Sequence, residues 1–444
     1  MRVTMASLLA PAAVAQTPLS LQQAVSMALE KNPQRKMAVA DQRAAEAGVR
    51  EARSGLLPRV SFTESATRGN DPVYVFGTRL RQERFTVADF ALNRLNTPTP
   101  IGNFSSRFFG NWDLFDSFAN VRSVARAKDL QQAAGQQLER ADQETIFHVV
   151  QAYLGLLLAQ KQQDVAEQSV RTAQSILDRS RARYESGVVV QSDLLSAQVR
   201  LAGRQEELIR SRNNVAFAAA QLDTAMGVPA DTEFQPSQAL SQGALPQAAL
   251  LDLEKRGLAS RPDLKQIEAQ QMAQEKSVSI ARSAFGPKLN AFGGWETDSA
   301  TLSQVQGNNW VAGLELQVDL FQGGAKKAQL TREKALQERI AAGHQAAVDQ
   351  VRLEVRRAFY DFDSARQQVA VVQAAVGQAD ESMHINQNRY DAGITTITDL
   401  LTIEEALRRA QTDYWEAVYR LRTSYANLEL ATGTLSTGSL VIMP

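Results

Sequence analysis

The sequence predicts a mixed α and β protein that consists mainly of long α-helices. Two stretches with one pattern, YESGVVVQSDLLSAQ from Tyr184 and YDAGITTITDLLTIE from Tyr390, lie 206 residues apart. A proline-free stretch from 324 to 391 carries apolar residues at alternating spacings of four and three, which is typical of a long packed helix. Residues 311–321 instead alternate between apolar and polar, as a β-strand does.

The composition limits the classes of protein and of site. The 444 residues carry 48 basic and 48 acidic side chains, so no basic face for nucleic acid is expected. Without cysteine, disulfides, thiolate metal sites and thiol nucleophiles are excluded. The three histidines lack metal-ligand spacing, and no phosphate loop or nucleophile elbow occurs. We therefore expect no enzyme activity, no cofactor, no metal and no nucleic-acid partner.

The N-terminus, MRVTMASLLAPAAVA, has the features of a signal peptide over 1–15. Arg2 gives a short basic start, an apolar run follows, and the small residues ending at Ala15 fit a cleavage site. An ordinary frayed terminus is the alternative interpretation. The sequence contains no run of 18 or more apolar residues, so no membrane-spanning helix is predicted. An exported protein of this kind belongs in the periplasm, the medium or the outer membrane.

An internal duplication organises most of the chain. At a shift of 206 residues the two copies match without a gap from 113 to 227. Upstream the shift becomes 229, because the first copy carries 23 extra residues between Pro58 and Asp113. A duplication of this length indicates two copies of one structural unit. The expected parts are a first repeat over 16–229, a linker over 230–245, a second repeat over 246–435 and a C-terminal tail over 436–444.

Each copy predicts the same four elements: a helix that begins at a proline, a β-hairpin, a very long helix, and an antiparallel return helix. Their ranges are 33–56, 58–115, a long helix up to Gly187, and 192–226 in the first copy, and 262–285, 287–321, 324–391 and 398–432 in the second. About 67 helical residues span on the order of 100 Å. Gly187 and Gly393 end the long helices, so we expect a positive φ at both.

The strands of both hairpins predict one apolar and one polar face. Partner strands are expected over 59–68 and 288–297. Trp112, Trp295 and Trp310 would form an aromatic girdle at a membrane interface, or would simply pack within the strands. The extra sequence of the first copy lies inside its hairpin, and three interpretations stay open for it: a lid, a phage-receptor-like loop and a tolerated insertion.

Neither half of the chain forms a closed structure in lipid. Four strands with an apolar outer face leave open edges, which a bilayer does not tolerate. Three copies would supply about twelve strands, enough to close a barrel, together with a matching set of helical columns. Strand counting therefore predicts a trimer, and other multiples with an even strand count stay open.

The whole pattern resembles the TolC family of outer-membrane efflux proteins. The most specific pieces are the Asn-Pro and Arg-Pro helix starts, LLPRV and FGPKL, WDLFDSF and VDLFQGG, and the two tip motifs, and the resemblance covers 19–435. It implies a homotrimer with a 12-stranded outer-membrane β-barrel, four strands per chain, continued by a periplasmic α-helical barrel.

The same resemblance implies a function and partners. The chain would be the exit channel of a tripartite efflux or type I secretion system, set in outer-membrane lipid and extending into the periplasm. An inner-membrane pump would feed it through a periplasmic adaptor protein. The alternative function is a periplasmic adaptor or another exported coiled-coil scaffold, but such proteins lack two apolar hairpins and do not duplicate the whole unit.

Finally, the resemblance implies a periplasmic gate at the hairpin tips. Asp399 matches one acidic position of the ring that lines the pore, whereas Thr402 stands at the second. Tyr390 and Asp193 match the pair whose bond joins neighbouring hairpins and closes the mouth.

Two features of the tips depart from the family or have simpler explanations. Thr395 stands where the family has an arginine, so the link from that position to Ser192 is expected to be absent. Ser192 and Thr398 would be N-caps, each followed by an acidic residue that the helix dipole favours. Tyr184 would be a hydrophobic staple across its tip.

Overall fold

The computed structural model describes residues 17–230, 232, 234–302 and 304–442. The predicted signal peptide, 1–15, lies outside the described residues. The chain divides into two compact units. The described parts of the first unit are the residues up to Ala40, Gln136–Lys265 and the residues from Gln345 onward, and those of the second are Asp41–Gly135 and Gln266–His344.

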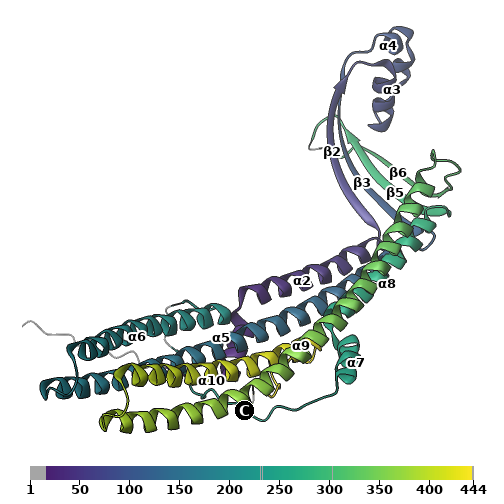
Figure 1. The fold of residues 1–444 in the computed structure, drawn as a ribbon. Helices are drawn as coiled ribbons and strands as arrows, with labels where there is room; N and C mark the ends of the chain where they lie inside the picture. Colours follow the sequence, from purple (N-terminus) through teal and green to yellow (C-terminus); the bar gives the residue numbers. More distant parts are fainter. Residues whose placement is uncertain (1–16, 231, 233, 303, 443–444) are drawn as a thin grey trace, which may run out of the picture. The chain divides into compact units, whose positions relative to one another are not determined.

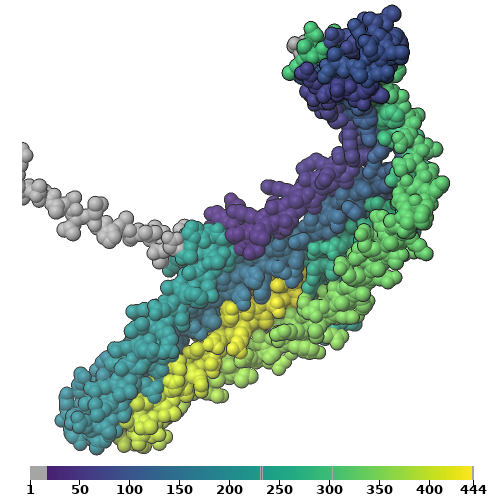
Figure 2. Space-filling model, turned by 90° about the horizontal axis from the view of Figure 1, so that it is seen from above, coloured from purple at the N-terminus to yellow at the C-terminus, as the bar shows by residue number. Residues whose placement is uncertain are grey.

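Two antiparallel helical hairpins supply most of the first unit. Helix α5 (Ala119–Glu185) is followed by α6 (Gln191–Met226), and α9 (Ala325–Asp391) is followed by α10 (Ile397–Ala431). The first unit contains α5 from Gln136 onward and α9 from Gln345 onward. Figures 1 and 2 both show α10, in yellow, running alongside α9. The predicted long helix and both return helices are confirmed to within one residue at each end.

The apolar seam predicted along the long helices forms the core of this unit. In α9 the buried seam residues include Val355, Ala358 and Phe362, and in α5 they include Val149 and Leu156. These side chains belong to one continuous cluster that also includes residues of α6 and α10. The spacing of four and three keeps them on one face of each helix, so that the helices pack along their length.

The first unit also contains four shorter elements: β1 (Thr17–Leu19), α1 (Leu21–Lys31), β4 (Phe234–Pro236) and α7 (Leu250–Ser260). The strands β1 and β4 pair in parallel. The buried Tyr153 hydroxyl donates to the Leu19 carbonyl at 2.9 Å and holds β1 against α5. The strand β4 lies within the predicted linker over 230–245. It has only three residues, too few for an apolar–polar alternation to be recognised in the sequence.

The duplication is repeated in tertiary contacts. A side chain at Gly227, after α6, would collide with the backbone of Asn32, the residue before α2 (Pro33–Ser54). In the second copy, Gly433 lies in the same way against Arg261, the residue before α8 (Pro262–Ser283). In each copy the end of the return helix therefore packs against the start of the proline-led helix.

The second unit contains a four-stranded antiparallel sheet with the order β2-β3-β5-β6. Its strands are β2 (Arg59–Gly69), β3 (Ile101–Phe115), β5 (Lys288–Ser299) and β6 (Gly307–Gln317). Because Phe108 pairs with Phe62 and Trp295, and Trp295 with Trp310, these four aromatic side chains share one face of the sheet. Trp112, four residues after Phe108 on β3, lies on that face as well.

The last predicted strand ends earlier than expected. The alternation of 311–321 placed its end at Phe321, but β6 ends at Gln317. Gln317 pairs with Lys288, which directly follows Pro287, and a proline has no N–H to extend the ladder. Within the part of the chain that the structure describes, residues 318–321 therefore pair with no strand.

The extra sequence of the first hairpin folds into helical structure. It contains α3 (Pro72–Arg81), the short 3-10 helix η1 (Val87–Phe90) and α4 (Leu92–Asn96). Figure 1 shows α3 and α4 at the end of the sheet where β2 is followed by β3. None of the helices in the described part of the chain combines the length and the apolar character that a membrane span requires.

Candidate functional site

The tips of the two helical hairpins have the same backbone geometry. Gly187 and Gly393 have φ values of +75° and +74°, which confirms the predicted positive φ. At the first tip the Gly187 amide donates to the Tyr184 carbonyl at 2.9 Å and the Val188 amide to Arg183 at 2.9 Å. The second tip repeats both bonds. This is the Schellman arrangement, which ends a helix at a left-handed glycine and satisfies its last carbonyl groups.

Tyr390 is buried at the second tip and is held by the end of α5. Its hydroxyl lies 3.0 Å from the Ser180 Oγ, and both side chains are buried. The Arg183 guanidinium lies over the Tyr390 ring, 4.9 Å from its centroid, and donates to the Tyr390 carbonyl. Within one chain, the Tyr390 hydroxyl therefore contacts Ser180 and not Asp193, the partner predicted on a neighbouring hairpin.

A salt bridge reinforces the contact between the two long helices. Arg179 Nη1 lies 2.7 Å from an Asp391 carboxylate oxygen, one residue after Tyr390. Together, Arg179, Ser180 and Arg183 of α5 bind the last residues of α9. No pattern in the sequence distinguishes these three, because arginine and serine near a helix end are ordinary exposed residues.

Asp399 caps its own helix. Its Oδ2 accepts from the Thr396 hydroxyl at 2.7 Å, from the Thr396 amide at 3.2 Å and from the Thr395 hydroxyl at 3.1 Å. The Asp399 amide donates back to the Thr396 hydroxyl at 3.2 Å, which completes a capping box. These bonds to Thr396 and Thr395 lower the pKa of Asp399, because they favour the charged carboxylate.

The predicted N-caps are therefore corrected. Thr396 rather than Thr398 caps α10, since the helix begins at Ile397. In the first copy Val190 occupies the N-cap position instead of Ser192, and no side chain there bonds to the helix start. The Asp193 amide donates to the Val190 carbonyl at 3.1 Å, so Asp193 lies in the first turn, as expected.

The two copies of the tip motif differ in burial. Tyr390 is 2% exposed, whereas its counterpart Tyr184 is 40% exposed. Thr402, at the second position of the expected acidic ring, is exposed and donates its hydroxyl to the Thr398 carbonyl at 2.8 Å. The second tip is therefore held within the chain, while Tyr184 of the first tip remains available to another surface.

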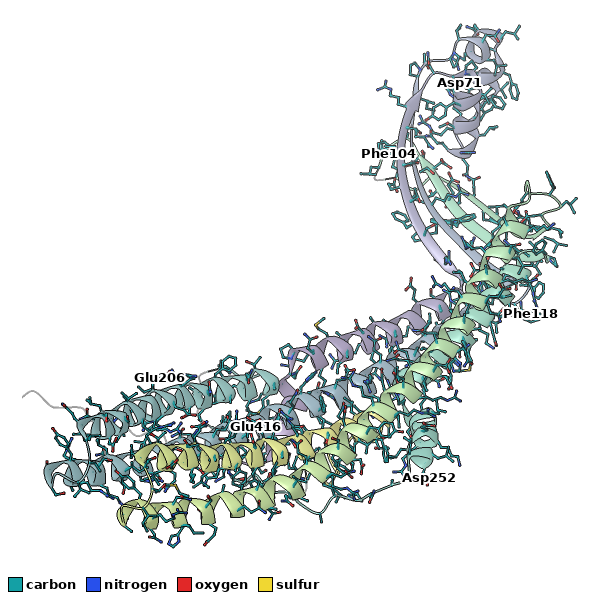
Figure 3. The ribbon with its side chains drawn as sticks, viewed as in Figure 1. Asp71, Phe104, Phe118, Glu206, Asp252 and Glu416 are labelled. Atoms are coloured by element: carbon teal, nitrogen blue, oxygen red, sulfur yellow. The ribbon has the colours of Figure 1, made fainter. Side chains whose placement is uncertain are left out.

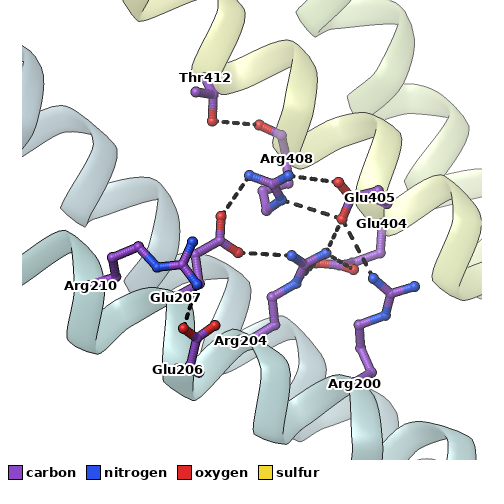
Figure 4. A network of polar contacts seen from close by, with 9 residues as sticks. All are labelled: Arg200, Arg204, Glu206, Glu207, Arg210, Glu404, Glu405, Arg408 and Thr412. Atoms are coloured by element: carbon purple, nitrogen blue, oxygen red, sulfur yellow. Dashed lines mark hydrogen bonds and ion pairs between the residues drawn. The ribbon is translucent and has the colours of Figure 1, made fainter.

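A network of charged side chains joins the return helices α6 and α10 (Figure 4). Arg204 of α6 binds both carboxylate oxygens of Glu404 of α10, at 2.8 and 3.1 Å, and also Glu405. Arg408 of α10 binds Glu405 at 2.6 Å and Glu207 of α6 at 2.9 Å. Positive and negative groups alternate through the network, so charges from both hairpins are neutralised in one place.

The centre of this charge network is buried. The side chains of Arg204 and Glu404 are only 7% and 3% exposed. Among the described contacts, both side-chain oxygens of Glu404 are bound by Arg204 alone. Bonds from Arg408 and Arg204 lower the pKa of Glu405 to about 2. Sequence patterns do not reveal such a network, because isolated charges on a helix normally indicate a solvated face.

Comparison with known proteins identifies a family. The family model described as outer membrane efflux protein matches residues 24–228 and 254–434. The chain is 24% identical to alkaline protease secretion protein AprF of Pseudomonas aeruginosa, over 96% of this chain and 86% of AprF. It is also 24% identical to outer membrane protein TolC of Escherichia coli, over 96% of this chain and 84% of TolC.

Solved structures show the same fold. The CmeC outer membrane channel of Campylobacter jejuni superimposes with a TM-score of 0.79 at 18% identity, over 99% of this chain and 95% of CmeC. The outer membrane protein VceC of Vibrio cholerae gives a TM-score of 0.77 at 20% identity, over 93% of this chain and 96% of VceC. The predicted fold class, with mainly long helices and a TolC-like architecture, is confirmed.

Proposed function

Because the chain belongs to the outer membrane efflux protein family, we propose that it is the outer-membrane exit channel of a tripartite efflux or type I secretion system. The observation that carries this function is the combination of a sheet with one apolar face and two duplicated helical hairpins. A periplasmic adaptor needs no such sheet, so the alternative function is not retained.

The working unit is a homotrimer. The end strands β2 and β6 each have a single neighbour in the described sheet, and three copies would join these edges into a barrel of about twelve strands. Such closure satisfies the backbone groups that lipid cannot. The apolar face, with Phe62 and Trp310, would then contact lipid, and the polar face would line the lumen.

Exposed heptad positions on the helices support the same assembly. On α6, Leu195, Ala202 and Ile209 are exposed and follow one another at intervals of seven residues. On α9, Leu353 and Tyr360 are exposed with the same interval. A seam with this spacing packs against another helix. We assign these two seams to neighbouring copies of the chain.

The hairpin tips form the periplasmic mouth. Three Asp399 carboxylates around a three-fold axis would make a ring that attracts cations. Tyr390 and Arg183 would hold the second hairpin of each copy in its resting position, while Asp193 and the exposed Tyr184 would face neighbouring hairpins. The partners in this arrangement are a periplasmic adaptor and an inner-membrane pump, which deliver the substrate to the mouth.

Fractionation and electrophoresis test this function. The protein should require detergent for extraction from outer membranes and should migrate as a trimer that heating converts to a monomer. Ile209→Glu should abolish the trimer band, since it places a charge in the α6 seam. Leu251→Glu is the matched control, because Leu251 is equally exposed but lies on α7. A detergent-stable monomer that retains its β-structure would refute the trimeric channel.

A further inference from the structure

The two β-hairpins of the chain are closed in different ways. The second hairpin passes from Ser299 to Gly307 by a short connection, whereas the first carries α3, η1 and α4 between Gly69 and Ile101. The residue pattern of this insert is compatible with a lid, a receptor loop or a tolerated insertion. Its contacts with the sheet distinguish between them.

The insert is bound to one particular face of the sheet. Gln82, which follows α3 and is 1% exposed, donates to the Asn103 side chain at 2.8 Å and to the Ser299 carbonyl at 3.1 Å. The Tyr74 hydroxyl lies 2.9 Å from the Thr67 hydroxyl. Thr67 and Asn103 are directly paired in β2 and β3, so both bonds reach the same face.

That face is the polar one. Asn103 and Phe108 are five positions apart on β3, and side chains at an odd offset point to opposite faces, so Asn103 points away from the aromatic face. The buried Asn103 side chain, which Gln82 contacts, donates to Asp298 at 2.6 Å, and the buried Ser105 two positions along the same face donates to Glu296 at 2.7 Å. The insert therefore covers polar side chains that would otherwise be open to water.

The insert is a packed structure of its own. The ring centroid of Phe85 lies 4.7 Å from the centroid of Phe76 and 5.2 Å from the centroid of Phe90. Asp89 is buried, binds Arg79, and accepts from the Thr86 amide at 2.9 Å. These contacts give the insert a defined shape, in contrast to a tolerated insertion without structure.

The start of α3 and its contact with β6 are equally defined. Asp71, labelled in Figure 3 beside the strand that carries Phe104, caps α3 by accepting from the Tyr74 amide at 2.9 Å. At the other end of α3, a side chain at Gly307 of β6 would collide with the Arg81 carbonyl. The insert thus reaches from β2 across the sheet to β6.

We propose that this insert is an internal lid, which folds over the polar face at the outer end of the barrel and limits the size of what leaves the channel. The inference rests on the proposed channel function, in which the polar face lines the lumen. The strands β2 and β5 begin directly after α2 and α8, at the end of the sheet that leads to the periplasmic helices. The insert lies at the other end, which would therefore face the outside of the cell. Three lids, one from each copy, would narrow the exit.

Labelling of a single cysteine from outside the cell tests the lid. The protein contains no cysteine, so Arg107→Cys provides the only thiol. Arg107 lies on the polar face beyond the covered Asn103 and Ser105, and it is exposed. On intact cells, a small charged methanethiosulfonate should react with this thiol, whereas a bulky polyethylene-glycol maleimide should not.

Removing the lid should abolish this size dependence. Replacing 71–100 by an Asn-Gly turn should let the bulky reagent react several-fold faster. Gln82→Ala, which keeps the chain length, should raise its rate in the same direction even where the deletion does not fold. Val73→Ser is the control, because Val73 is 80% exposed on α3 and should leave the rate unchanged.

The outcomes separate the lid from the channel. Equal reaction of both reagents with the Arg107→Cys protein that retains the insert would overturn the lid. Unchanged bulky labelling in Gln82→Ala and in a folded deletion variant would also overturn it. If the small reagent does not react in any variant, the polar face is not open to the outside, and the proposed channel itself is refuted.

Discussion

Replacing Arg204 by methionine should destabilise the helical hairpins strongly. Methionine keeps much of the side-chain volume but leaves the Glu404 carboxylate, 3% exposed, without the guanidinium that binds both its oxygens. Breaking a buried ion pair on one side costs about 3–5 kcal/mol. We expect a loss of this size per chain in the free energy of unfolding.

The chain offers two matched controls for this change. Arg210 binds Glu206 on the same helix, but both side chains are about two-thirds exposed (67% and 64%), so Arg210→Met should cost less than about 0.5 kcal/mol. In the double variant Arg204→Met/Glu404→Leu no buried charge is left unpaired at this position. Its stability should return to near that of the parent, because apolar replacement of a buried pair is often neutral.

Urea denaturation followed by circular dichroism measures these differences, at equal protein concentration for every variant. Acid provides an independent readout. The pKa of Glu405 is lowered to about 2 from 4.5, so its stabilising contribution is present above pH 4.5 and is lost as the pH falls toward 2. The reasoning is wrong if Arg204→Met and Arg210→Met shift the midpoint equally, or if the double variant is no more stable than the single one.

The remaining predictions concern the tips. Gly393→Val should lower the free energy of unfolding by about 1–2 kcal/mol or more, because it forces a side chain onto a left-handed backbone and its Cβ would lie 3.3 Å from Arg183 Nη2. Gly187→Ala, with open space around its Cβ, should lower it less in the same urea denaturation. Tyr390→Phe combined with Asp193→Ala should raise single-channel conductance in planar bilayers, and an unchanged conductance would contradict a latch at Tyr390. Asp399→Ala should weaken cation selectivity and block by trivalent cations, and it should also remove the capping box; if only stability changes, Asp399 is a capping residue alone.

Periodicity in the amino-acid sequence determined the main elements of this protein. The Pro-free heptad stretch predicted the long helix over 324–391, and α9 covers Ala325–Asp391. The shift of 206 residues predicted that the first copy has the same helix, and α5 and α9 each contain 67 residues. Such features are local or repeat at a fixed interval, so the order of the residues alone expresses them.

The residues of the tips were only partly predictable. Gly187 and Gly393 were identified because a left-handed residue after a long helix favours glycine. The sequence did not predict that Tyr184 is exposed and Tyr390 buried, because both tyrosines stand at the same position of the same motif. Burial depends on what packs against a side chain, and here that is Ser180 and Arg183, about two hundred positions away along the chain from Tyr390.

Tertiary structure alone decided the charge network and the position of the insert. Arg204 and Glu404 look like solvated helix residues in the sequence, and only the packing of α6 against α10 makes them a buried pair. The insert sequence is compatible with a lid, a receptor loop or a plain insertion, and only the bonds from Gln82 and Tyr74 place it on the polar face. In both cases the deciding interaction joins segments whose distance in sequence carries no periodic signal, so the folded chain had to bring them together.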